Sequence, residues 1–309
     1  MEVGIDLNRD SSVIKNRISC FLIALVRYLL LIGLSFIIIY PFITKISTMF
    51  MSEKDFRDPL VWLIPKFPTL EHLDYVIKEG SYIKTLIITA SLSLGCALLQ
   101  TASCTMVGYG LARFKFRGRG LLMGLMVFTI VIPPATLGSS IYIKFRFFDF
   151  FKIFQNLFGK SLNLMDTVWP LLILSITALG LKNGLYMLVM WQRFKGIPKE
   201  LSEASYVDGA NAWQTFLYVI MPQAKAMMIS VFILSFAWQW TDEFYNKMFF
   251  NKIPVLSTMV SSVTMNVRAN SGAAVGNAAL ILVILPLLIV YLFAQRFLIQ
   301  GIEQSGLVG

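Results

Sequence analysis

Long apolar blocks, separated by short polar or basic stretches, dominate the chain. Their apolar positions do not repeat every two or 3.6 residues, as they would on the half-buried strands and helices of a water-soluble fold. A helix needs about 20 mostly apolar residues to cross a hydrocarbon core of about 30 Å. The blocks therefore predict spanning helices over residues 21–46, 82–112, 121–143, 167–191, 225–240 and 273–297.

The predicted fold is an all-α membrane protein, a polytopic bundle of six transmembrane helices. Residues 1–20 are too polar for a cleaved signal peptide and are expected to form a tail before the first helix. Residues 21–297 would form the membrane domain and residues 298–309 a second tail. The strand-like alternation that a membrane β-barrel needs is missing from the sequence.

Prolines and aromatic residues modify this pattern at three places. Pro133 and Pro134 lack backbone donors, so they are expected to break or bend the third span. Residues 144–166 are rich in aromatic and basic side chains, which predicts an interfacial helix lying on the membrane. Residues 47–80 are polar and proline-rich, so we expect an extramembrane loop there.

Composition and charge agree with lipid as the solvent. Of the 309 residues 57% are hydrophobic and 14% charged, and the mean hydropathy is +0.70. The net charge of +10 would favour nucleic acid as a partner of a soluble protein. Here the basic residues lie between apolar blocks, so membrane lipid is the expected partner and nucleic acid is not.

Metal, cofactor and catalytic chemistry find little support in the sequence. The cysteines Cys20, Cys96 and Cys104 lie in or beside apolar stretches without CxxC spacing, and His72 is the only histidine. We therefore expect no disulfide, metal site or cofactor. Walker A, HExxH and Cys–His patterns are missing as well, so the chain is not expected to be an enzyme.

One polar segment carries a more specific pattern. A helix is predicted over residues 199–207, and Gly209 ends it because glycine best tolerates a left-handed cap. Asn211 with Gln214 three residues later has the form of a capping box and predicts a second helix, which Pro222 is expected to end. Two short helices would thus meet at a glycine corner outside the membrane, a suitable rigid contact for another protein.

This segment resembles the EAA loop of bacterial ABC importer permeases. The resemblance rests on Glu203-Ala204-Ser205, Asp208-Gly209-Ala210 and Ile220-Met221-Pro222. The flanking residues are similar to the carbohydrate branch, to which the smaller maltose permease belongs, and the similarity covers residues 28–309. Ser205 stands where a second alanine is usual and Met221 where leucine is usual, both mild changes.

The resemblance implies an ATP-driven importer of a sugar or oligosaccharide in the bacterial cytoplasmic membrane. Loop 192–224 would couple the permease to the ATPase, with Glu203 as the acidic contact and Gly209 allowing the sharp turn. The implied partners are a second permease subunit, two cytosolic ATP-binding-cassette ATPases and an extracellular or periplasmic sugar-binding protein. ATP hydrolysis would lie on the ATPase, whose motion drives alternating access.

Topology follows from the six crossings and from charge. Both termini would lie on one side, and the two sides hold equal numbers of basic residues. The cluster formed by Arg113, Lys115, Arg117 and Arg119 occupies a short turn at a helix end, where charge influences topology most. It tips the balance toward cytosolic termini, in agreement with the resemblance.

Polar residues within the spans are candidates for the substrate pathway, because buried polar groups usually face a cavity or a partner. Lys182 and Asn183 lie inside the fourth block, Trp238 and Gln239 end the fifth, and Asn277 lies in the sixth. Aromatic rings and amides suit sugar rings, which stack and hydrogen-bond. A tryptophan at a helix end is, however, also typical of an interfacial anchor.

An ion-coupled secondary transporter of a small polar solute is the alternative function. Such a protein would be expected to carry intramembrane acids for a proton or sodium relay. The interiors of the first four spans and of the sixth contain no Asp or Glu. The sequence therefore favours the importer.

Overall fold

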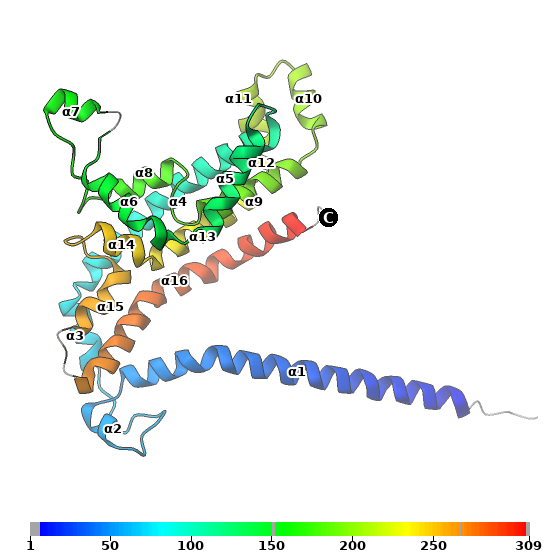
Figure 1. Ribbon diagram of the computed structural model, residues 1–309. Coiled ribbons are helices and arrows are strands. Elements are labelled where there is room, and N and C mark those ends of the chain that lie inside the picture. Colours follow the sequence, from blue (N-terminus) through cyan, green and yellow to red (C-terminus); the bar gives the residue numbers. More distant parts are fainter. Residues whose placement is uncertain (1–6, 150–151, 266, 268, 307–309) are drawn as a thin grey trace, which may run out of the picture. The chain divides into compact units, whose positions relative to one another are not determined.

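The computed structural model describes residues 7–149, 152–265, 267 and 269–306 (Figure 1). Its elements are helices, and the described residues contain two isolated β-bridges but no β-strand. The all-α prediction is therefore confirmed. The chain divides into two compact units, one of residues 1–73 and 268–281 and the other of residues 74–267 and 282–309.

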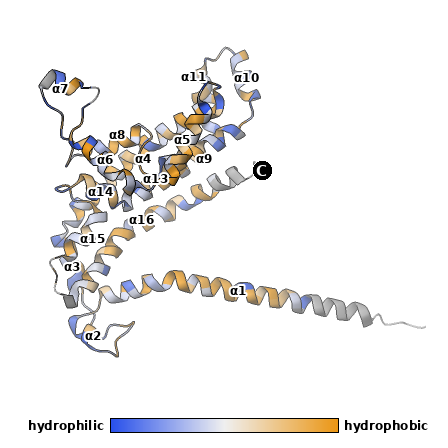
Figure 2. Ribbon diagram, in the orientation of Figure 1, coloured by the Kyte–Doolittle hydropathy of each residue, from blue (hydrophilic) through white to orange (hydrophobic). Residues whose placement is uncertain are grey.

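The long helix α1, Leu7–Met49, dominates the first unit. Its apolar segment, Ser19–Met49, agrees with the predicted span of residues 21–46, and the helix itself begins earlier, at Leu7. Residues 7–20 contain neither glycine nor proline, so nothing stops the helix where the apolar block begins. The most apolar 18-residue window of the segment Ser19–Met49 contains no buried residue, and Figure 2 shows hydrophobic residues along most of the segment.

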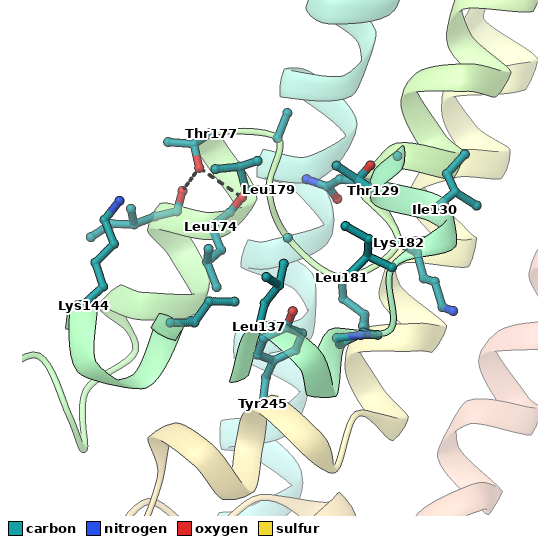
Figure 3. Close-up of a pocket in the computed structure, with 18 of the residues that line it drawn as sticks. Thr129, Ile130, Leu137, Lys144, Leu174, Thr177, Leu179, Leu181, Lys182 and Tyr245 are labelled. Atoms are coloured by element: carbon teal, nitrogen blue, oxygen red, sulfur yellow. Dashed lines mark hydrogen bonds between the residues drawn. The ribbon is translucent and has the colours of Figure 1, made fainter. Parts of the chain in front are cut away.

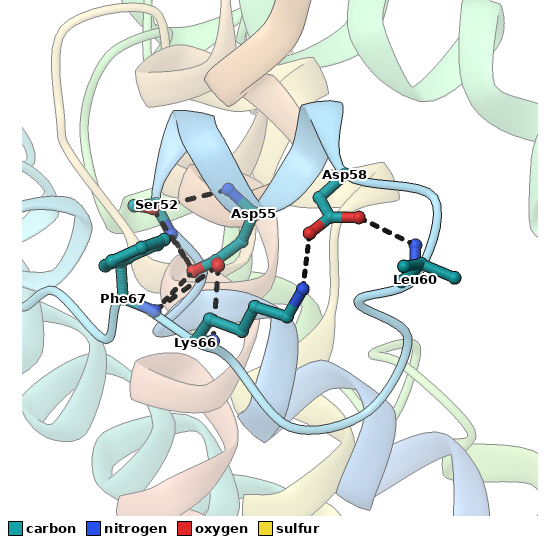
Figure 4. A network of polar contacts seen from close by, with 6 residues as sticks. All are labelled: Ser52, Asp55, Asp58, Leu60, Lys66 and Phe67. Atoms are coloured by element: carbon teal, nitrogen blue, oxygen red, sulfur yellow. Dashed lines mark hydrogen bonds and ion pairs between the residues drawn. The ribbon is translucent and has the colours of Figure 1, made fainter.

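A hydrogen-bonded loop follows α1 in this unit. Ser52 caps the short helix α2, Glu53–Arg57, through a reciprocal pair of hydrogen bonds with Asp55. The Asp55 carboxylate also accepts hydrogen bonds from the backbone N–H groups of Lys66 at 3.2 Å and Phe67 at 3.2 Å. Lys66 forms an ion pair with Asp58 at 2.5 Å (Figure 4). The loop expected over residues 47–80 is therefore ordered around one carboxylate.

The charge of Asp55 is favoured by these contacts. Desolvation acts to raise the pKa of Asp55, but the hydrogen bonds from the Ser52, Phe67 and Lys66 backbone N–H groups bring its pKa below the ordinary 3.8. A carboxyl whose pKa is lowered by folding stabilises the fold above its unfolded pKa. That contribution is lost as the pH falls through the lowered folded value.

Asp55→Asn is expected to loosen the loop at neutral pH, because an amide offers one acceptor oxygen where the carboxylate offers two. Thermolysin cleavage between residues 58 and 66 should accelerate several-fold. The nearby Glu53→Gln serves as a control, since the Glu53 ion pair with Arg57 is exposed and 3.8 Å long. Pepsin should cleave the wild type and Asp55→Asn at converging rates once the pH falls below the lowered folded pKa of Asp55, because the native carboxyl is then protonated. Equal thermolysin rates would contradict this account.

Helix α4, Tyr82–Arg113, is the central helix of the second unit. It packs against α8 (Trp169–Ile176), α9 (Asn183–Gly196) and α13 (Lys225–Thr241). The approach to α9 is close, since a Cβ added at Gly108 would lie 2.7 Å from Met190 Cβ. The second span, predicted over residues 82–112, is confirmed as a helix whose small residues permit dense packing.

The third span is broken where its prolines predict. Helices α5, Arg119–Val131, and α6, Pro134–Arg146, meet at a bend of 104°. The interfacial helix expected over residues 144–166 is wrong, because the only helix after α6 and before α8 in the described residues is α7, Ile153–Phe158. Left-handed residues at both of its ends, Lys152 and Gly159, limit α7 to six residues.

The fourth span is also interrupted, which the sequence did not predict. Residues 177–182 separate α8 from α9, and Ala178 and Lys182 within them have φ angles of 57° and 59°. A Cβ at Gly180 would lie 2.7 Å from Gln100 Nε2 of α4, so glycine lets this turn pack directly on the central helix. The turn between α8 and α9 thus packs closely on α4, and the helix is interrupted there.

The remaining helices complete the two units. The segment that resembles the EAA loop contains α10 (Glu200–Val207), α11 (Ala212–Gln214), the π-helix η1 (Thr215–Ile220) and α12 (Met221–Gln223). After α13 come α14 (Phe244–Phe249), α15 (Leu256–Thr264) and α16 (Ala269–Gly306). Helix α3, Glu71–Glu79, precedes α4. The last helix is longer than the 273–297 predicted and takes up most of the expected tail.

Membrane-spanning length is found in fewer helices than the sequence predicted. Among the described residues, three helices are long and apolar enough to cross a membrane, namely Ser19–Met49, Tyr82–Arg113 and Ser271–Ile299. Two bent pairs, α5 with α6 and residues 212–223 with α13, raise this number to five if each is one span. The structure thus supports three to five spans by length and composition.

Candidate functional site

The segment that resembles the EAA loop folds as two helices at a glycine corner. Helix α10 ends before Gly209, whose φ of 85° is left-handed. Asn211 accepts a hydrogen bond from the Gln214 backbone N–H at 2.9 Å, and the Gln214 side chain accepts one from the Asn211 N–H at 2.9 Å. The predicted glycine stop and capping box are both confirmed.

The second helix ends one residue after Pro222, close to the predicted position. The helix continues through η1 into α12 and ends at Gln223, and it then bends by 77° into α13. Pro222 occupies the first turn of α12, where a missing N–H is tolerated. A π-helical turn such as η1 is uncommon and frequently accompanies a functional site.

Aromatic rings and a hydroxyl pair fix the base of this element. Ser205 is buried and its Oγ lies 2.8 Å from Thr215 Oγ1. Tyr109 of α4 packs on Phe216 and Phe194, with ring centroids 4.5 and 5.5 Å apart. Ser205 therefore replaces an alanine at a position that faces inward, where its hydroxyl finds a partner.

The opposite side of α10 faces outward. Glu203, Ala204, Asp208 and Gly209 are exposed, and Ala210 is half-buried. Val207 is 88% exposed. An exposed surface that combines apolar and acidic side chains on a rigid corner is typical of a protein contact.

Both ends of this element are tied to the bundle. Arg113 Nη2 at the end of α4 donates a hydrogen bond to the Ile197 carbonyl at 2.8 Å. Arg193 Nε of α9 donates one to the Gln223 carbonyl at 3.2 Å. These two hydrogen bonds connect the ends of the element to α4 and α9.

A pocket lies in the second unit where α8 and α9 are interrupted. Its volume is about 610 Å³, and residues 177–185 form one wall (Figure 3). Apolar side chains from α6 and α8 contribute most of the remaining surface. The polar groups are few, and they comprise Thr129, Lys144, Thr177, Lys182, Asn183 and Tyr245. A mostly apolar pocket with a few polar groups is the usual form of a small-molecule site.

The structure brings some of the predicted pathway residues together. Lys182 Nζ lies 4.8 Å from the centroid of the Trp238 ring. Asn183 and Gln239 are each 2% exposed, and Asn183 Oδ1 and Nδ2 and Gln239 Nε2 have no partner among the described residues. Asn277 belongs to the first unit, where its Oδ1 accepts a hydrogen bond from Lys45 at 3.2 Å.

A polar cluster in the core of the second unit escaped sequence reasoning. Gln100 of α4 accepts a hydrogen bond from the Ser235 hydroxyl and donates one to Ser175 Oγ at 3.4 Å. Ser103 donates to the Ser175 carbonyl at 2.8 Å. The signal was Gln100, an amide in the middle of an apolar block.

The chain matches a known family over most of its length. Residues 105–304 match the family described as the binding-protein-dependent transport system inner membrane component. The chain belongs to this family. It is therefore a multi-pass inner-membrane subunit of a transport system that depends on a binding protein, and the predicted family and membrane location are confirmed.

Relatives within the family are named for sugar transport. The maltodextrin transport system permease protein MdxG of Bacillus subtilis is 24% identical over 292 residues, which cover 91% of this chain and 95% of that protein. The sulfoquinovosyl glycerol permease SmoH of Agrobacterium fabrum is 26% identical over 273 residues, with coverage of 88% and 89%. Both are named as transport permeases.

A solved structure shares the fold. A chain of a bacterial ABC transporter involved in the import of the acidic polysaccharide alginate superposes with a TM-score of 0.65. It is 22% identical and covers 90% of this chain and 97% of that chain. The arrangement of helices is therefore that of an ABC importer permease.

Proposed function

We propose that this protein is a pore-forming subunit of an ATP-driven importer for a sugar or oligosaccharide. Family membership supports transport, and the printed names of relatives support a carbohydrate substrate. The observation that carries the proposal is the outward-facing helix corner at Gly209, which is tied to the bundle by Arg113 and Arg193. A permease that is driven by a separate ATPase needs such a contact.

The proposed topology has six crossings with both termini in the cytosol. Residues 1–20 and 298–309 would be cytosolic tails, and residues 21–297 the permease domain. Helix α13 has 17 residues, and its length of about 25 Å nearly matches the hydrocarbon core. Helices α8 and α9 would form one interrupted crossing, since non-helical backbone is tolerated at membrane depth where it lines a cavity.

Coupling would proceed through the corner of loop 192–224. Glu203, Ala204, Asp208, Gly209 and Ala210 would form the docking surface, while Ser205 and Pro222 shape the corner from within and behind it. ATP-driven closure of the ATPase would displace this surface. The tied helices would then switch between inward-facing and outward-facing states, a two-state equilibrium that docking biases.

The partners would be a second permease subunit, two ATP-binding-cassette ATPases in the cytosol and an external sugar-binding protein. Helix α1 supports this assembly, because an apolar 18-residue window without a buried residue needs lipid or another permease around it. Within the pore, Lys182, Asn183, Trp238 and Gln239 would line the substrate pathway. ATP hydrolysis would be the task of the ATPase.

Cysteine labelling tests the proposed orientation. Asp208→Cys, in a Cys20→Ser background that removes the exposed native thiol, should resist a membrane-impermeant maleimide in intact cells and react after lysis. Lys160→Cys, in the connection between α7 and α8, should react in intact cells. Reaction of the residue 208 thiol from outside would refute the docking of a cytosolic ATPase on this loop.

A further inference from the structure

The pocket at the interrupted α8–α9 segment has an unbalanced charge. Lys144 and Lys182 both line it, and Figure 3 shows them on opposite sides. No Asp or Glu occurs among its lining residues, and neither lysine has an ion-pair partner within the described part of the chain. The acids near lining residues in the sequence are engaged elsewhere. Asp149, which follows the lining residue Phe148, accepts hydrogen bonds from the Phe154 and Gln155 backbone N–H groups at 3.0 and 3.3 Å. Asp242 is buried and accepts one from the Tyr245 backbone N–H at 3.1 Å, and Glu243 forms an ion pair with Lys247.

The charge of Lys182 is positioned without being neutralised. Its ammonium lies 4.8 Å from the centroid of the Trp238 ring. An aromatic face attracts a cation through its quadrupole but carries no net charge, unlike a carboxylate. Lys182 is therefore held in place while its positive charge stays available to an anion in the pocket.

The start of α9 adds to this positive potential. Lys182 stands at its N-cap with a φ of 59°, and no side chain caps the helix. The Asn183 and Leu185 backbone N–H groups donate to the Gly180 and Lys182 carbonyls at 3.2 and 3.0 Å. The positive potential here therefore comes from the helix dipole, which favours a negative charge near the N-terminus. The N-terminus of α9 lies in the pocket wall, since residues 182–185 all line the pocket.

A buried amide in the same wall has no partner. Asn183 is 2% exposed, and both its Oδ1 and its Nδ2 have no hydrogen-bond partner among the described residues. Buried polar groups are ordinarily satisfied, so an unpartnered pair of atoms beside a pocket indicates a missing ligand or water. A Cβ at Gly180 would lie 3.4 Å from Asn183 Nδ2 and 2.7 Å from Gln100 Nε2, so both amides lie close to this glycine.

We infer that this pocket accepts an anionic saccharide, one that carries a carboxylate, sulfonate or sulfate group. The inference rests on the proposed importer function and narrows its substrate class. The anionic group would contact Lys182 and the N-terminus of α9, with the Asn183 amide rotating toward the sugar hydroxyls. Lys144 on the opposite side would meet a second charged unit, and the apolar walls would contact the sugar C–H faces.

Binding to the assembled permease–ATPase complex tests this inference. The complex is placed in phosphatidylcholine nanodiscs without the binding protein, and equilibrium dialysis compares trigalacturonate with the neutral galactotriose. Trigalacturonate should bind at least about tenfold more tightly, as expected of a charge-assisted contact. Lys182→Gln should remove most of this preference, and Lys182→Arg should keep it.

Lys195→Gln is the matched control. Lys195 also lies over a tryptophan, with its Nζ 5.1 Å from the Trp191 ring centroid, but it is outside the pocket. This variant should bind trigalacturonate like the wild type. Equal binding of the two saccharides, no binding of trigalacturonate, or an unchanged preference in Lys182→Gln would overturn the inference.

A second arm separates a saccharide from an anionic lipid headgroup, which offers the same chemistry. Phosphatidylglycerol is added to the nanodiscs and should leave the binding of trigalacturonate unchanged. Displacement by this lipid would identify a lipid site and overturn the saccharide. Co-purification of the ATPase tests the importer function separately, because it requires no sugar. A complex that forms but does not prefer trigalacturonate would contradict the substrate class alone.

Discussion

Gly209→Trp is expected to abolish co-purification of the ATPase while the protein stays folded in the membrane. Gly209 has a φ of 85°, and a Cβ there would meet no atom within 4 Å. The left-handed backbone costs a non-glycine residue about 1–2 kcal/mol, which a fold of this size tolerates. The indole would project from the exposed corner and prevent close docking of a second protein.

Gly159→Trp is the matched control for this variant. Gly159 also has a left-handed φ, 69°, and no atom within 4 Å of an added Cβ, but it ends α7 and not α10. The two variants therefore have the same backbone cost and the same added side chain. Gly159→Trp should retain the wild-type amount of ATPase in an affinity pull-down. A normal ATPase stoichiometry with Gly209→Trp would disprove the docking of the ATPase at this corner.

The sequence predicted those parts of the fold that local chemistry determines. Proline pairs lack donors wherever they occur, so the break at Pro133 and Pro134 followed directly. The Gly209 corner and the Asn211 capping box depend on residues within a few positions of each other. Long apolar blocks likewise predicted α4 and most of α1 and α16.

The interruption of the fourth span could not be predicted in this way. The apolar block continues through residues 177–182, and its single break signal, Gly180, is tolerated within many helices. The left-handed turn forms because the turn packs against Gln100 of α4, nearly eighty positions away. Contacts between distant segments decide the local conformation here, and hydropathy does not describe them.

In the candidate site, too, the sequence identified some residues and missed others. Lys182 and Asn183 were found because polar residues are costly inside an apolar block. The sequence predicted Lys144 in the interfacial helix. In the structure Lys144 belongs to α6, beyond the bend between α5 and α6, and lines the pocket. Asn277 satisfied the same polarity rule as Lys182, yet it pairs with Lys45 in the first unit. Polarity identifies candidates, and tertiary packing determines which of them share a cavity.

Close packing of α4 and α9 yields the second prediction of large effect, Gly108→Ala. A Cβ at this position would lie 2.7 Å from Met190 Cβ and 2.9 Å from the Trp191 backbone nitrogen. Backbone atoms cannot rotate away as a long side chain can, so the two helices would have to separate. Overpacking of this kind costs about 1–3 kcal/mol, and it should lower the temperature at which the detergent-purified protein aggregates.

Gly110→Ala, two positions along the same helix, should have the opposite sign. Its added Cβ would have Phe114 Cδ2 at 4.0 Å as its only neighbour. Replacing glycine by alanine in a helix without a clash stabilises it by about 0.5–1 kcal/mol. Gly108→Ala and Gly110→Ala thus make the same substitution in the same helix and differ in the distance of the added Cβ from α9. Equal aggregation temperatures for the two variants would show that the contact at Gly108 does not limit the packing of the bundle.

The same substitution should also affect transport. Helices α4 and α9 hold the ends of the corner at Gly209 through Arg113 and Arg193. Gly108→Ala should therefore reduce ATP-driven transport by more than its loss of folded protein explains.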